Sequence, residues 1–71
     1  MMTHQEKIRL TNDIADAIMT GSATMGHICK EGCFKFILPK PQLAGTIEQR
    51  KTYAMTQAID MVIQYKRYLV E

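Results

Sequence analysis

The chain is 71 residues long, 46% hydrophobic and 23% charged, with a formal net charge of +2. These values are ordinary for a globular protein and exclude a disordered chain, and the length allows one domain, residues 1–71. The nine lysine and arginine residues are spread from Lys7 to Arg67 rather than gathered in a block, so the composition gives no footprint for nucleic acid. A core this small is marginal, which raises the question of self-association at the outset.

The sequence contains no pattern of an export signal or a membrane span. Thr3 to Arg9 is polar where a signal peptide would be apolar, and no stretch approaches the roughly 20 apolar residues that cross a bilayer. Two cysteines and six methionines fit a reducing compartment. We therefore expect a cytoplasmic protein with no membrane partner, in which Cys29 and Cys33 are thiols.

A first helix is predicted from the T-x-x-E spacing of Thr3 and Glu6, the pattern of a capping box. Gly21 supplies the left-handed position at which helices commonly end. At 100° per residue, the apolar strip consists of Leu10, Ile14, Ala17 and Ile18. The opposite side carries Asp13 and Asp16 among other polar residues, and a solvated helix face explains this carboxylate pair better than acid–base chemistry or a divalent ion.

A β-hairpin is predicted between Met25 and Leu38, because Phe34, Phe36 and Leu38 alternate with Cys33, Lys35 and Ile37. Residues 30–32, Lys-Glu-Gly, fit a short turn with glycine at the positive-φ position of a bulged hairpin. Ile28 is the expected core residue of the preceding strand. Two prolines, Pro39 and Pro41, end the second strand.

A second helix is predicted from the capping spacing of Thr46 and Gln49, and no residue interrupts the helical pattern from there to Glu71. Its apolar residues cover an arc of about 140°, and a second strip lies beside that arc. The expected architecture is a two-layer α+β domain in the order helix, β-hairpin, long C-terminal helix (α-β-β-α).

The second strip of this helix is the most informative functional feature. A hairpin and one other helix can cover one face of a helix but hardly both, and an exposed apolar strip usually marks an interface. We therefore favour a non-enzymatic interaction module that self-associates through its C-terminal helix, and we suggest a phage or mobile-element protein acting on a host macromolecule. The alternative is that the first helix covers the strip within the monomer. The predicted interface residues are Ile59, Ile63, Val70 and Tyr68.

His27, Cys29 and Cys33 form the only cluster with metal-ligand chemistry, and all three are expected on the solvent face of the hairpin. A small zinc-stabilised domain is one hypothesis, but a structural zinc site needs four ligands and only the remote His4 is left as the fourth. Two reduced thiols explain the pattern better, and a cross-strand disulfide is the third possibility. A Cys/His enzyme lacks an orienting residue and an oxyanion donor. We predict no metal, no cofactor and no catalytic residue.

The start of the second helix is a candidate anion site. The helix that begins at Thr46 has free N–H groups at its N-terminus, with Arg50, Lys51 and Tyr53 nearby, so a nucleotide or nucleic-acid backbone is the alternative partner there. Lys66, Arg67, Tyr65 and Tyr68 would extend that binding mode by charge and stacking. The competing interpretation is that Thr46 is a cap and that Arg50 and Lys51 only increase solubility.

Overall fold

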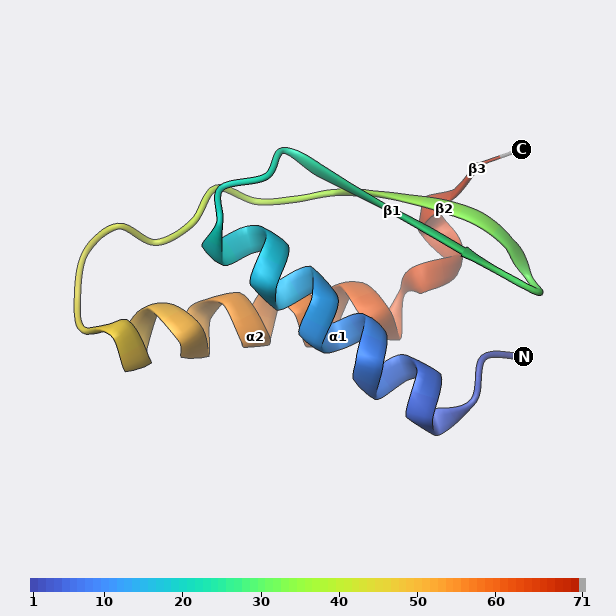
Figure 1. The fold of residues 1–71 in the computed structure, drawn as a ribbon, viewed down its shortest axis with the longest axis horizontal. Helices are drawn as coiled ribbons and strands as arrows, with labels where there is room; N and C mark the ends of the chain where they lie inside the picture. The colour runs from blue at the N-terminus through green and yellow to red at the C-terminus, as the bar shows by residue number, and fades with distance from the viewer. Residues whose placement is uncertain (71) are drawn as a thin grey trace.

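The computed structural model describes residues 1–70 and confirms the α+β class (Figure 1). Its helices are α1 (His4–Met19) and α2 (Ile47–Ile63), followed by a short 3-10 helix, η1 (Tyr65–Tyr68). Its strands are β1 (Thr24–Cys29), β2 (Gly32–Ile37) and β3 (Leu69–Val70), which form one antiparallel sheet in the order β1-β2-β3. The sheet makes one layer and the two helices make the other, with α1 crossing α2 (Figure 1).

Both predicted capping boxes are confirmed. The Thr3 side chain accepts a hydrogen bond from the Glu6 N–H at 3.1 Å, and the Glu6 carboxylate accepts from the Thr3 N–H at 3.3 Å. Thr46 and Gln49 form the same pair of bonds at the start of α2. Such caps satisfy N–H groups that have no partner inside the helix. At the other end of α1, Gly21 follows the last turn with a φ of 81°, as predicted.

The hairpin has a two-residue turn at Lys30 and Glu31, so that Cys29 pairs with Gly32 and every earlier pair follows from that one. Gly32 has a positive φ of 133°, as predicted, but the expected bulge is wrong, because Gly32 pairs directly with Cys29 as the first residue of β2. Phe34 and Phe36 point into the core, as expected from their alternation. Because residues directly opposite each other share a face of the sheet, His27 must lie on the inner face with Phe34.

The prediction that Ile28 belongs to the core is therefore wrong. Ile28 pairs with Cys33 on the outer face of the sheet, and 80% of it is exposed. The inner positions of β1 are Met25, His27 and Cys29, each half-buried. The turn length determines which face each residue occupies, and a shift of one residue would exchange the two faces.

The expected continuous helix to the C-terminus is also wrong, because α2 ends at Ile63. The chain then forms η1 and pairs β3 with β2, matching Phe34 to Leu69 and Cys33 to Val70. No glycine or proline causes the break. Tertiary contacts do, since the buried Tyr65 ring packs edge-on against Phe34 at 5.5 Å.

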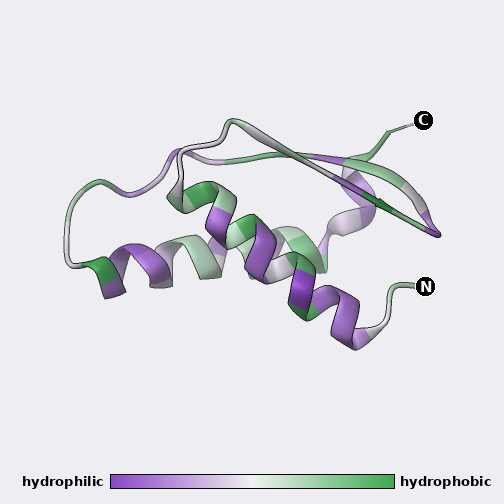
Figure 2. Ribbon diagram, viewed as in Figure 1, coloured by the Kyte–Doolittle hydropathy of each residue, from purple (hydrophilic) through white to green (hydrophobic). Residues whose placement is uncertain are grey.

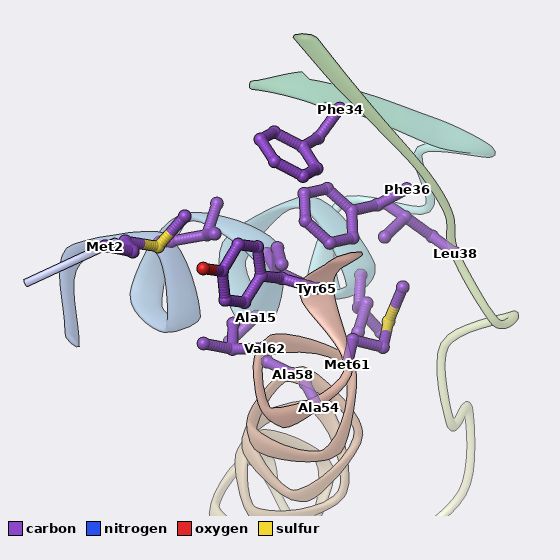
Figure 3. Close-up of a cluster of buried hydrophobic side chains, with 13 residues drawn as sticks. Met2, Ala15, Phe34, Phe36, Leu38, Ala54, Ala58, Met61, Val62 and Tyr65 are labelled. Carbon is purple, nitrogen blue, oxygen red and sulfur yellow. The ribbon is translucent and has the colours of Figure 1, made fainter. Parts of the chain in front are cut away.

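The core lies between the two layers (Figure 3). Phe34 and Phe36 point down from the sheet toward Tyr65, while Val62 lies beside Ala15 of α1. Hydrophobic residues recur along α2 and return in β3, with the hydrophilic η1 between them (Figure 2). No helix within residues 1–70 is long and apolar enough to cross a membrane. The buried residues are Met2, Leu10, Ile14, Ala15, Ile18, Phe34, Phe36, Leu38, Ala54, Ala58, Met61, Val62 and Tyr65.

Candidate functional site

An exposed apolar patch lies on the side of the helix layer that faces away from the sheet. On α2, the buried Val62 lies on the side that packs against α1. Viewed along the helix axis, Ile59 lies about 60° and Ile63 about 100° around the helix from Val62. On α1, Ile8 lies within about 20° of the buried Ala15. Its neighbour Lys7 has its ammonium 6.0 Å from the ring centre of Tyr65, which follows the end of α2. We call Ile8, Ile59 and Ile63 the helix-layer patch.

No part of the chain within residues 1–70 covers this patch. Exposed fractions are 50% for Ile8, 47% for Ile59 and 75% for Ile63. The alternative in which α1 shields the second strip of α2 is therefore wrong for these residues. Two methionines that are half-buried against the core lie on the same sides of the helices as the patch, Met19 on α1 and Met55 on α2. Flexible methionine side chains suit a surface that accepts a partner.

The other two predicted interface residues lie elsewhere. Val70 is 52% exposed and pairs with Cys33, so it lies on the outer face of the sheet, in one cross-strand row with Ile28. The Tyr68 ring packs on Phe36 with 4.8 Å between ring centres, at the edge of the core. The four residues do not form one surface, because the break after Ile63 turns the chain into the sheet layer.

Of the predicted anion-site residues, Thr46 and Tyr53 line a shallow depression at the start of α2, whereas Arg50 and Lys51 do not. The lining residues are Gln42, Thr46, Glu48, Gln49, Thr52 and Tyr53. The Thr46 cap uses the Gln49 N–H, Arg50 Nε donates to the carbonyl of Gln42 at 3.1 Å, and the Tyr53 hydroxyl donates to the carbonyl of Lys40 at 3.2 Å. These bonds hold the loop between β2 and α2 on the helix. Lys51 is exposed.

The Cys/His cluster is divided between two faces of the hairpin, which corrects the expectation that all three side chains face solvent. His27 and Cys29 lie on the inner face, whereas Cys33 lies on the outer face, and both cysteines are free thiols. His27 Nε2 is buried without a hydrogen-bond partner in the described part of the chain. No group of three potential metal ligands comes together among residues 1–70.

One polar contact was not predicted from the sequence. The hydroxyl of the buried Tyr65 donates to the Glu31 carboxylate, with distances of 2.8 and 3.1 Å to its two oxygens. This hydrogen bond, with help from the Met1 ammonium 3.6 Å away, lowers the pKa of Glu31. The same hydrogen bond raises the pKa of Tyr65. The sequence pattern placed Glu31 in a turn and Tyr65 in a helix. It could not indicate this hydrogen bond, because the two residues are 34 positions apart.

Replacing Tyr65 with phenylalanine should raise the pKa of Glu31 toward its usual range. A carboxyl with a lowered folded-state pKa stabilises the fold at neutral pH, and this contribution is lost as the pH falls through that pKa. At high pH the contribution is lost as the pH rises through the raised pKa of Tyr65. Carbon NMR titration of the Glu31 carboxyl in both proteins measures the effect, and an unchanged pKa in Tyr65→Phe would contradict the assignment.

No protein-family model, curated protein or solved structure matches this chain.

Proposed function

We propose that this chain is a small, non-enzymatic protein-interaction module that self-associates through α2 and acts by binding another macromolecule. The observation that carries the proposal is the exposure of Ile59 and Ile63 on one side of α2, together with that of Ile8 on α1. An apolar patch of this kind on a small domain is typical of an interface. A second copy related by a twofold axis would place patch against patch.

Several features of the described chain fit this role. The depression at the start of α2 is shallow, and the side chains of Arg50 and Tyr53 are already engaged with backbone carbonyls, which gives less support to the nucleotide or nucleic-acid alternative. The split of His27 and Cys29 from Cys33 gives the zinc alternative little support. We also propose a cytoplasmic location, which the two free thiols support. A phage or mobile-element origin is the last part of the proposal.

A charge placed in the helix-layer patch should weaken self-association. We expect Ile59→Lys/Ile63→Lys to lower the solution mass, because burying an unpaired ammonium group is costly. The lysine stems can lie along the helix surface, so the monomer should stay folded. Gln57→Lys, which adds the same charge about 160° around α2 from Ile59 and about 120° from Ile63, is the matched control and should leave the mass unchanged.

Mass measurement by light scattering across a dilution series, with circular dichroism to check folding, gives the answer. Equal masses for the folded double variant, the Gln57→Lys control and the original chain would remove α2 as the association surface.

A further inference from the structure

We propose that β1 is a pairing edge for a second copy of this chain, in an antiparallel register centred on Gly26. This surface is separate from the helix-layer patch, and the inference does not depend on it. A dimer paired through β1 would leave Ile59 and Ile63, on the far side of the helix layer, free for the association proposed above.

The hydrogen-bonding groups of β1 divide into two sets. The Leu38 N–H donates to the carbonyl of Ala23 at 2.9 Å, in line with the register of the hairpin. Hydrogen-bonded pairs alternate along an antiparallel ladder, so Met25, His27 and Cys29 also direct their backbone groups to β2. Thr24, Gly26 and Ile28 therefore direct theirs to the free edge of the sheet, since β1 has a neighbouring strand on one side only.

These three residues are arranged symmetrically about Gly26, which makes the edge complementary to itself. With Gly26 opposite Gly26 of the second copy, Thr24 lies opposite the second copy's Ile28, and all three pairs are of the hydrogen-bonded kind. About six backbone hydrogen bonds would form, against about four if His27 were at the centre. Thr24 and Ile28 would also meet as a cross-strand pair on the outer face, partly covering the exposed Ile28.

The edge also lacks the features that keep a strand from pairing. Residues 24–29 read Thr-Met-Gly-His-Ile-Cys, with no lysine, acidic residue or proline, and the register with β2 runs without a bulge. Natural proteins usually protect an exposed edge with one of these devices. The far edge of β2, in contrast, carries the exposed Lys35 and is partly covered by β3. A second copy on β1 would make a continuous six-stranded sheet.

Cysteine cross-linking tests the register directly. In a Cys29→Ser/Cys33→Ser background, Gly26→Cys would place two thiols opposite each other with the Cα atoms about 5.5 Å apart, inside the range that a disulfide needs. The position has room, because a Cβ there would have the Phe34 carbonyl oxygen as its nearest atom at 3.9 Å. We expect most of this variant to become a disulfide-linked dimer under mild oxidation.

Thr24→Cys in the same background is the matched control. Its thiol would be about 13 Å along the strand from the equivalent thiol of the second copy, so Thr24→Cys alone should not form a disulfide-linked dimer. Mixed with Ile28→Cys, it should form a disulfide between the two variants. Adding Ile63→Lys to Gly26→Cys should leave the cross-link intact, which separates this surface from the helix-layer patch. A folded Gly26→Cys protein that stays single, or Thr24→Cys that cross-links equally well alone, would overturn the proposal.

Discussion

Phe36→Ala should leave the chain largely unfolded at 25 °C. Phe36 is fully buried at the centre of the core, stacked with Phe34 at 6.4 Å and against Tyr68 at 4.8 Å. Truncating a buried phenylalanine to alanine costs about 3–5 kcal/mol through lost apolar contact and the cavity that remains. A single core in a domain of this size supplies about the same amount, so little stability would be left.

Urea unfolding followed by far-ultraviolet circular dichroism measures this effect. The matched control is Ile37→Ala, at the next residue on β2 but on the exposed outer face. It should change the free energy of unfolding by no more than about 0.5 kcal/mol. A Phe36→Ala protein that unfolds cooperatively at the same urea concentration as the original would contradict the placement of Phe36 at the centre of the core.

Ala58→Leu should lower the free energy of unfolding by about 1–3 kcal/mol, because added methylene groups in a filled core force side chains and backbone to shift. Ala58 is fully buried, and Ala15 and Ala54 are buried with it where α1 and α2 pack together (Figure 3). Three small residues at this contact let the two helices approach closely. A leucine at position 58 would push them apart.

Thr56→Leu is the control for this second substitution. It adds a similar side chain on the exposed side of α2, where leucine has a higher helix propensity than threonine. Its stability should be equal to or slightly above that of the original chain. If thermal unfolding gave the same midpoint for Ala58→Leu and Thr56→Leu, the close helix contact at Ala58 would be contradicted.

Local signals predicted most of the fold. Each capping box needs residues only three positions apart, and the alternation of Phe34 and Phe36 needs a single strand, so both can be read from neighbouring residues. The inner face of β1 was predicted wrongly, because the single isoleucine of that strand, Ile28, outweighed the three half-buried residues of the opposite face. The turn length, not the hydrophobicity of one residue, sets that register.

Signals that depend on distant residues were missed. The sequence from Tyr65 to Val70 fits a helical period, yet its aromatic and branched residues also suit a strand, and pairing with β2 decides between the two. That choice moves Val70 and Tyr68 away from Ile59 and Ile63. The helix-layer patch was therefore predicted only in part, and Ile8 of α1 joins it because the two helices cross in space.

The solution mass of the unmodified chain across a concentration series tests the central claim most directly, since both proposed surfaces require a second copy. One chain has a mass of 8.1 kDa. The account predicts a mass of at least two chains at micromolar concentration, falling toward one chain on dilution. A mass of one chain at every concentration, from a protein whose circular dichroism shows it folded, would contradict it.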